Sequence, residues 1–371
     1  MEKAASPRLR SLDQYRGYTV AGMFFVNFAG GLAAIPAIFG HHHTYCSYAD
    51  TIMPQFFFAV GFAFRMTFLK RVASFGARDA YHHAIKRNLT LFVVAVVWYG
   101  LRGHYSSWET LREVGLMGLF TQRWYLPVFQ TLAHIACTSL WVLPVIGARG
   151  RVRFAFMVFS AALFVLCSQL GYYNWVNLYK GVDGGPLSFM SWTIPLLLGA
   201  YAFDVLEAKG PKGAIKPLIL CGALFMMVGY GLSCLNAITH SLGDPTSATG
   251  LARWFVEPPF VRPSRTVDIW TMSQRSGSIT YLTFAGGLAT ALLALFVWLC
   301  DLRGWEWGVF RTLGQNALAA YIVHDVLIEQ ISPFTPRDSP FWYVALMTAV
   351  FFYLTWLIMR YLEKNKLYLK L

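Results

Sequence analysis

The sequence predicts an all-α, polytopic integral membrane protein with about ten transmembrane helices in one bundle. Two observations predict this fold class. Hydrophobic residues make up 56% of the 371-residue chain and charged residues only 13%, whereas a soluble domain carries about 25% charged residues. Apolar runs of about 20 residues recur from one end of the chain to the other, and a helix of that length spans the hydrocarbon core of a bilayer.

The predicted spans are defined by apolar runs between polar loops. No polar stretch is long enough to fold separately, so we expect a single integral-membrane domain over residues 1–371, with tails at 1–16 and 360–371. The ten runs are 17–39, 51–69, 84–101, 124–145, 154–176, 187–205, 214–234, 278–300, 314–331 and 341–359.

The distribution of positive charge predicts the orientation of these spans. Of the 31 Lys and Arg residues, 21 lie in the segments on the same side as the two termini and nine lie in the opposite loops. Positive residues mark the cytoplasmic side, so both termini are expected in the cytoplasm and residues 40–50 outside. In a bacterium the membrane would be the inner (plasma) membrane. We interpret the net charge of +13 as a topology and lipid signal and expect no nucleic-acid partner.

The first span begins with polar residues. Ser11 and Gln14 fit a capping box, and Asp13 falls in the first turn, where a helix favours an anion. Arg16 is three residues after Asp13, so the two side chains share a face. This pair either anchors the span at the interface or places Arg16 at the mouth of a site for a cytosolic ligand.

Asn27 lies about ten residues into the first span, near the middle of the membrane at about 1.5 Å per residue. Gly30, Gly31 and Pro36 follow it. Glycine and proline weaken a helix, so we expect the chain from Gly30 to unwind or to line a cavity, where irregular backbone is tolerated at membrane depth. The Asn27 amide then either links helices or belongs to a site.

The loop after the first span holds three adjacent histidines, His41–His43, followed by Asp50. Histidine suits proton transfer near neutral pH, and a carboxylate can orient it. An amide such as that of Asn27 can stabilise a developing oxyanion. Together these groups suit the transfer of an acyl group to an amine or a hydroxyl. The alternative interpretation is a solvent-exposed loop without a catalytic role. Adjacent histidines do not converge easily on one ion, so no metal is expected, and nothing visible activates Cys46 as an acyl carrier.

Two further regions are candidates for substrate binding. His324 and Asp325 lie near mid-bilayer in the span 314–331, and ionisable groups at that depth normally face a cavity. The long outer loop 236–277 has no obvious secondary structure and is rich in aromatic residues, including Trp254. These aromatics either stack on sugar rings or form an interfacial belt.

Four segments of the chain carry a resemblance to a known family: SPRLRSLDQYRGYTVAGMFFVNFAGG, ADTIMPQFFFAVGFAF, RWYLPVFQTLAHIA and LGQNALAAYIVHDVL. They resemble the transmembrane heparan-α-glucosaminide N-acetyltransferase family of the transmembrane acyltransferase superfamily. The resemblance covers most of the chain and is strongest at 8–66 and 310–328. It implies a ten-span core and acetyl transfer from cytosolic acetyl-CoA to an amino sugar on the far side of the membrane.

The resemblance also implies roles for individual residues. The catalytic histidine of the family lies in the outer loop between its Asn span and its Ala-Asp span. Here His43 is the closest candidate, with His42 next, while the Asn corresponds to Asn27 and the acid to Asp50. From its position in the loop, His41 is expected to matter least, because its neighbour two positions on is better placed relative to Asp50. The chain departs from the family in this loop, because TYCSY follows the histidines where Trp and Gly are usual.

These observations predict a membrane acyltransferase in which His43 is the base, Asp50 orients it and Asn27 contacts the oxyanion or acyl donor. The acceptor, a small molecule or a glycan, is expected outside, near His324, Asp325 and Trp254. A multi-pass transporter or permease for a sugar or organic anion is the alternative, and homo-oligomer formation stays open. Acetyl-CoA is the expected co-substrate, and its nucleotide is expected on the basic inner side, near Arg10, Arg16, Lys70, Arg311 and Asn316.

Overall fold

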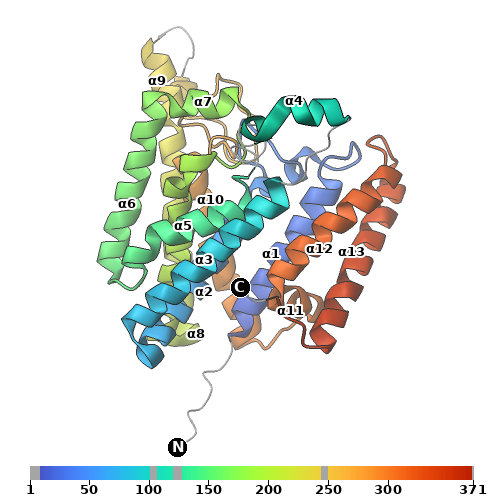
Figure 1. Ribbon diagram of the computed structural model, residues 1–371. Coiled ribbons are helices and arrows are strands. Elements are labelled where there is room, and N and C mark those ends of the chain that lie inside the picture. Colours follow the sequence, from blue (N-terminus) through green and yellow to red (C-terminus); the bar gives the residue numbers. More distant parts are fainter. Residues whose placement is uncertain (1–8, 101–106, 120–127, 244–249, 370–371) are drawn as a thin grey trace, which may run out of the picture.

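The computed structural model describes residues 9–100, 107–119, 128–243 and 250–369, and every regular element within these ranges is a helix. Figure 1 shows them as a bundle of long, steeply inclined helices. The α-helices are α1 (Arg10–Ala29), α2 (Tyr48–Phe75), α3 (Ala77–Gly100), α4 (Trp108–Leu119), α5 (Thr131–Ile146), α6 (Gly150–Cys167), α7 (Tyr173–Leu178), α8 (Phe189–Ser233), α9 (Leu235–Gly243), α10 (Ile279–Phe296), α11 (Gly308–Gln315), α12 (Ala317–Ile331) and α13 (Phe341–Lys364).

The predicted all-helical class is confirmed for this part of the chain, and helices overlap each of the ten predicted runs. Within the described residues, five helical stretches are long and apolar enough to cross a membrane: Tyr48–Phe75, Gly150–Leu178, Pro186–Gly243, Ile279–Leu302 and Phe341–Lys364. Many apolar side chains on α6 and α13 point outward, among them Phe159 and Leu346, as suits helices that contact lipid. The chain is therefore an integral membrane protein, and the number of about ten spans stays a prediction.

The first helix is shorter than the predicted span. It ends at Ala29, and residues 30–47 are irregular apart from one short turn at Ala37–Phe39. The predicted end at residue 39 is wrong, whereas the expected unwinding from Gly30 is confirmed. Gly30 itself lies close to other backbone, since a Cβ there would be 2.2 Å from the carbonyl oxygen of Phe39.

The start of α1 also differs from the prediction. The helix begins at Arg10 with Leu9 at its N-cap and no side-chain cap, so Ser11 does not form the predicted capping box. Gln14 instead exchanges two hydrogen bonds with the backbone of Trp307: its Nε2 donates to the carbonyl oxygen (3.1 Å) and its Oε1 accepts from the amide (3.2 Å). This tertiary contact joins α1 to the segment before α11.

Two loops differ in detail from the sequence-based expectation. The predicted runs 187–205 and 214–234 are joined in α8, which breaks at Gly210, where φ is +65°. A residue in this left-handed region is normally a glycine, so the break separates the two apolar halves. The outer loop 236–277 contains α9 and the short turn Gly250–Arg253, which corrects the expectation that it lacks secondary structure.

The core of the bundle is formed where α2, α8 and α10 pack against one another. Gly199 on α8 faces α2 so closely that a Cβ would lie 1.9 Å from the carbonyl oxygen of Phe58. Gly61 on α2 meets α8 in the same way, 1.8 Å from the carbonyl oxygen of Leu196. Small residues let helix backbones approach closely in membranes, and here they fix the position of α2.

The two ends of the bundle carry different features. Figure 1 shows α4, α7 and α9 at one end, together with the loop that follows α1. The turn between α2 and α3 and the start of α1 lie at the other end. The histidine loop and the segment 70–88, which holds five Lys and Arg residues, are thus at opposite ends, which agrees with the predicted topology. Which end faces the cytoplasm stays a prediction.

Candidate functional site

Asp50 is held by the local structure at the start of α2. Ser47 is the N-cap residue and Asp50 the third helical residue, and together they form a capping box. The Ser47 amide and hydroxyl each donate to Asp50 Oδ2 at 2.9 Å, and the Asp50 amide donates to Ser47 Oγ at 3.2 Å. The pattern Ser-x-x-Asp before an apolar run is a sequence signal for this arrangement. It leaves Asp50 Oδ1 available for a further partner.

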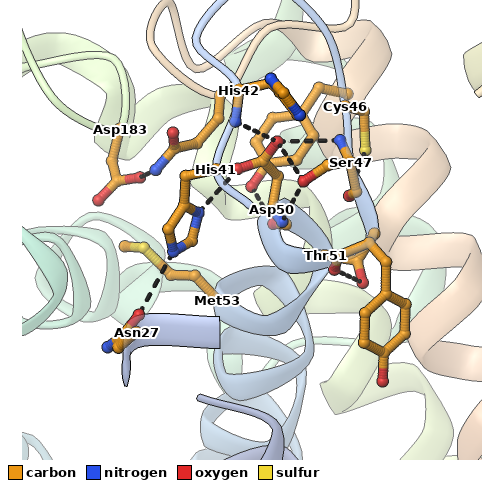
Figure 2. Close-up of polar contacts among 12 residues, drawn as sticks. Asn27, His41, His42, Cys46, Ser47, Asp50, Thr51, Met53 and Asp183 are labelled. Atoms are coloured by element: carbon orange, nitrogen blue, oxygen red, sulfur yellow. Dashed lines mark hydrogen bonds and ion pairs between the residues drawn. The ribbon is translucent and has the colours of Figure 1, made fainter. Parts of the chain in front are cut away.

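That partner is His41. Its Nδ1 lies 2.9 Å from Asp50 Oδ1, with the Asp50 side chain fully buried and the His41 side chain 38% exposed (Figure 2). Burial lowers the pKa of His41, but the hydrogen bond and negative charge of Asp50 more than offset it, so the pKa is raised above its usual value. A buried carboxylate thus orients a partly exposed imidazole, which is the geometry that a general base requires.

The expectation that His43 is better placed than His41 towards Asp50 is wrong. The amide of His42 donates to Asp50 Oδ2 (3.3 Å), so the chain passes the carboxylate at residues 41–42. His42 points its ring elsewhere, donating from Nε2 to the carbonyl oxygen of Ala37 (2.9 Å). At His43 the backbone turns away and its carbonyl oxygen accepts from Ser273 Oγ (2.6 Å). The direction of the backbone across the end of α2 therefore selects His41.

Asn27 joins His41 to a residue far along the chain. Its Oδ1 lies 3.3 Å from His41 Nε2, and its Nδ2 lies 3.2 Å from His324 Nε2. His324 is buried on α12 and stacks on the ring of Phe24, with ring centroids 5.2 Å apart. Its Nδ1 contacts the carbonyl oxygen of Tyr321. The predicted residues Asn27, Asp50 and His324 are thus brought together, with His41 between the first two.

The series of hydrogen bonds from His324 through Asn27 and His41 to Asp50, here called the histidine chain, defines which ring nitrogens carry a hydrogen. A carbonyl oxygen only accepts, so His324 Nδ1 carries the hydrogen and His324 Nε2 accepts from the Asn27 amide. Asn27 Oδ1 then accepts from His41 Nε2, while His41 Nδ1 donates to Asp50. Both ring nitrogens of His41 donate in this pattern, which fits an imidazolium. The site is therefore arranged to stabilise His41 after it has taken up a proton.

The other two predicted substrate-binding residues lie in different surroundings. Asp325 accepts a hydrogen bond from Trp98 Nε1 at 2.9 Å, which ties α12 to α3. Trp254 follows the turn at Gly250–Arg253 and is 59% exposed. Their roles in binding an acceptor stay predictions.

A cleft of about 770 Å³ lies among α1, α2, α3, α5 and α12. Three of the residues predicted to bind the nucleotide line it, whereas Arg10 and Arg311 are not among its lining residues; Arg311 lies 3.7 Å from Glu306 and 3.8 Å from Glu363. Arg71 and Arg87 also line the cleft, and the sequence analysis did not single them out. The polar lining includes Arg16, Lys70, Arg71, His83, Arg87 and Asn316.

The cleft and the histidine chain meet at Tyr321. Tyr321 lines the cleft, its carbonyl oxygen contacts His324, and its hydroxyl lies 2.6 Å from that of Tyr99 on α3. A ligand that fills the cleft would therefore contact Tyr321, whose backbone is bonded to His324. The arrangement can hold an anionic, elongated molecule at one end and move a proton at the other.

Comparison with known proteins gives one family match. A family model described as an acyltransferase domain matches residues 9–360. The matched range includes Asn27, His41, Asp50 and His324 as well as the lining of the cleft described above, Leu369 excepted. No curated protein matches the sequence.

Proposed function

The chain belongs to the acyltransferase domain family and is a membrane acyltransferase, and we propose that it transfers an acetyl group from cytosolic acetyl-CoA to an amino sugar on the opposite side of the membrane. The observation that carries this proposal is the meeting of the basic cleft with the His324–Asn27–His41–Asp50 chain at Tyr321.

The charge and size of the cleft support acetyl-CoA as the donor. Arg16, Lys70 and Arg87 line it, and phosphate groups favour Arg and Lys. Its volume of about 770 Å³ is within the usual range of small-molecule sites, roughly 300–1,000 Å³. In this proposal the nucleotide occupies the basic end and the thioester lies near Tyr321.

His41, rather than His43, is the proposed base. It removes a proton from the acceptor nitrogen as that nitrogen attacks the thioester carbonyl. The new C–N bond forms, the C–S bond breaks, and the proton passes from His41 to the thiolate of CoA. Asp50 stabilises the intermediate imidazolium, as expected for an orienting carboxylate.

Asn27 has a positioning role in this proposal. Its amide is engaged at both ends, by His41 and by His324, so it holds the His41 ring in place instead of making the predicted contact with the oxyanion. His324 in turn fixes the orientation of the amide, because its Nε2 accepts from Asn27 Nδ2.

The experiment is acetyl transfer by the purified protein in nanodiscs. With acetyl-CoA labelled in the acetyl group and glucosamine as the probe acceptor, we expect labelled N-acetylglucosamine and an equal amount of free CoA. A protein that neither acetylates glucosamine nor releases CoA would contradict the proposal. Labelled product that forms with glucosamine but not with glucose would support an amine acceptor.

A further inference from the structure

Asp183 is a buried carboxylate that the mechanism above does not use. It lies between α7 and the short helix Pro186–Ser188 and is 3% exposed. Its backbone is left-handed, with φ +53°, which is uncommon outside glycine. Its carbonyl oxygen accepts from Trp192 Nε1 (2.9 Å) and its Oδ1 accepts from Gln274 Nε2 (2.8 Å). Strained residues that the surroundings hold in place concentrate at functional sites.

Two loops hold this carboxylate in position. The amide of Gly184 donates to the carbonyl oxygen of Arg275 at 2.9 Å. Gly184 and Gly277 both have positive φ, +86° and +58°, and a Cβ on Gly277 would lie 2.9 Å from the Cα of Gly184. The loops 179–185 and 271–278 are therefore in direct backbone contact, and the second loop supplies Gln274 to the first.

The carboxylate is close enough to His41 for the two charges to interact. Figure 2 shows Asp183 on the side of His41 away from Asp50. The negative charge of Asp183 contributes to raising the pKa of His41. Burial raises the pKa of Asp183 itself to about 7, against the opposing effects of Gln274 and His41. A carboxyl group with such a pKa exchanges its proton near neutral pH.

The proposed reaction needs a second proton acceptor. An α-amino group has a pKa of about 7.7–8.0, so amines of this class are largely protonated at neutral pH. An ammonium nitrogen carries three protons and the secondary amide product keeps one, so two must leave. One ends on the sulfur of CoA, and His41 can carry only one at a time.

We propose that Asp183 is the first proton acceptor of the site and removes one proton from the ammonium group of the acceptor. This inference rests on the proposed function, because only a protonated amine needs it. The free amine then attacks the thioester, its second proton passes through His41 to CoA, and Asp183 releases its own proton to the outer solution. The balance is one ammonium and one acetyl-CoA giving one amide, one CoA thiol and one proton.

Several titratable groups surround Asp183 and belong to any interpretation of its pH dependence. His41, Asp50, Tyr281 and Tyr321 interact with its charge. Arg275 follows its partner Gln274, and His134 on α5 bonds the backbone of Val182. None of these residues is substituted in the variants below, so the same neighbouring titratable groups are present in every protein that is compared.

The test is the pH profile of kcat/KM with glucosamine as the probe acceptor. Asp183→Asn keeps an oxygen for the Gln274 amide but removes the charge. We expect a loss of about tenfold or more near pH 6.5, as for the loss of a positioned proton acceptor. The activity should recover above about pH 8.5, where an amine of this class is already free in solution. Asp183→Glu is the matched control and should retain the wild-type activity near pH 6.5, because it keeps the carboxylate.

A profile that matches the wild type, or a loss that is equal at every pH, would overturn the inference while acetyl transfer itself persists. A wild-type protein that never acetylates glucosamine would overturn the proposed function, and with it this inference, before any variant is made. Gln274→Leu provides a second measurement should Asp183→Asn fail to fold. It removes a hydrogen bond that lowers the pKa of Asp183, so the acid limb should move to higher pH, and an unmoved limb would refute the assignment.

Discussion

His41 and Asp50 show how single side chains define this site. Asp50 caps α2 with one carboxylate oxygen and orients His41 with the other. The carboxylate is buried and surrounded by donors, so its charge is directed at the imidazole instead of being screened by water. The neighbouring histidines share its sequence context but not its geometry. One hydrogen bond to Asp50 therefore distinguishes the proposed base, His41, from its two neighbours. Single substitutions of the three histidines can test this assignment.

The first prediction compares His41 with His43. If His41 is the base, His41→Ala should lower kcat by about 100-fold or more, because positioned acid–base catalysis contributes on the order of 10²–10⁴. His43→Ala is the matched control and should stay within about threefold of the wild type, since its ring, unlike that of His41, forms no hydrogen bond with Asp50. Steady-state kinetics at saturating acetyl-CoA decides between them. A large loss of kcat in His43→Ala but not in His41→Ala would identify His43 as the base instead.

The second prediction concerns the pH dependence set by Asp50. His41 must be neutral to accept a proton, and Asp50 raises its pKa above the usual value of 6.5, so kcat/KM should fall as the pH drops through that raised pKa. Asp50→Asn removes the negative charge and lowers the pKa of His41. The acid limb of the profile should then move to lower pH, together with a lower maximal rate. A limb that moves to higher pH would contradict the orienting role of Asp50.

At the scale of the elements, close helix packing sets the distance between the parts of the site. α2 carries Asp50 at one end and Lys70 towards the other, so its placement against α8 aligns both the histidine loop and the basic cleft. The contact depends on glycines, since backbone meets backbone at Gly61 and Gly199. Side chains at these positions must push the helices apart.

The third prediction tests this packing. Gly199→Ala places a methyl group 1.9 Å from the carbonyl oxygen of Phe58, and overpacking of a tight interface costs about 1–3 kcal/mol. We expect a lower thermal unfolding midpoint in detergent. Gly231→Ala is the control on the same helix, because a Cβ there meets nothing within 4 Å and alanine favours a helix. Equal midpoints for the two variants would contradict the close contact.

The fourth prediction concerns the residues of the cleft. Arg16→Gln and Arg87→Gln each remove a charged lining residue, and a hydrogen bond to a charged group contributes roughly 1.5–3 kcal/mol. The KM for acetyl-CoA should rise about tenfold or more in each variant, since about 1.4 kcal/mol corresponds to a factor of ten. Arg10→Gln changes a charge outside the cleft lining and should leave KM unchanged. Unaltered KM values for all three variants would contradict the proposal that acetyl-CoA binds in this cleft.

The whole molecule separates two tasks at the two ends of one bundle. The loop that holds His41 lies at the end with α4, α7 and α9, whereas Lys70 and Arg87 of the cleft belong to α2 and α3, which are joined by a turn at the other end. The Asn27–His324 contact spans 297 positions of sequence and links the two regions within the bundle. This arrangement suits a donor and an acceptor that never share one compartment.

The fifth prediction tests the orientation of the molecule. The Lys and Arg asymmetry of 21 to nine predicts that the termini lie in the cytoplasm and the histidine loop outside. Reporter fusions at residue 45 and at the C-terminus should therefore report opposite sides of the membrane. Both reporters on the same side would overturn the topology and the transfer across the membrane with it.

Local chemistry was enough for the sequence to determine the all-helical membrane class and the break after α1, and to select Asn27 and Asp50 as candidate site residues. Apolar length, the Gly30–Gly31 pair and the cost of polar groups at membrane depth act through near neighbours. The tertiary structure alone decided which histidine faces Asp50. It also decided that His324 holds Asn27, that Arg87 lines the cleft and that Asp183 lies near His41. These contacts join segments from different helices, and the direction of a side chain in a loop depends on the path of the backbone, which composition and spacing do not specify.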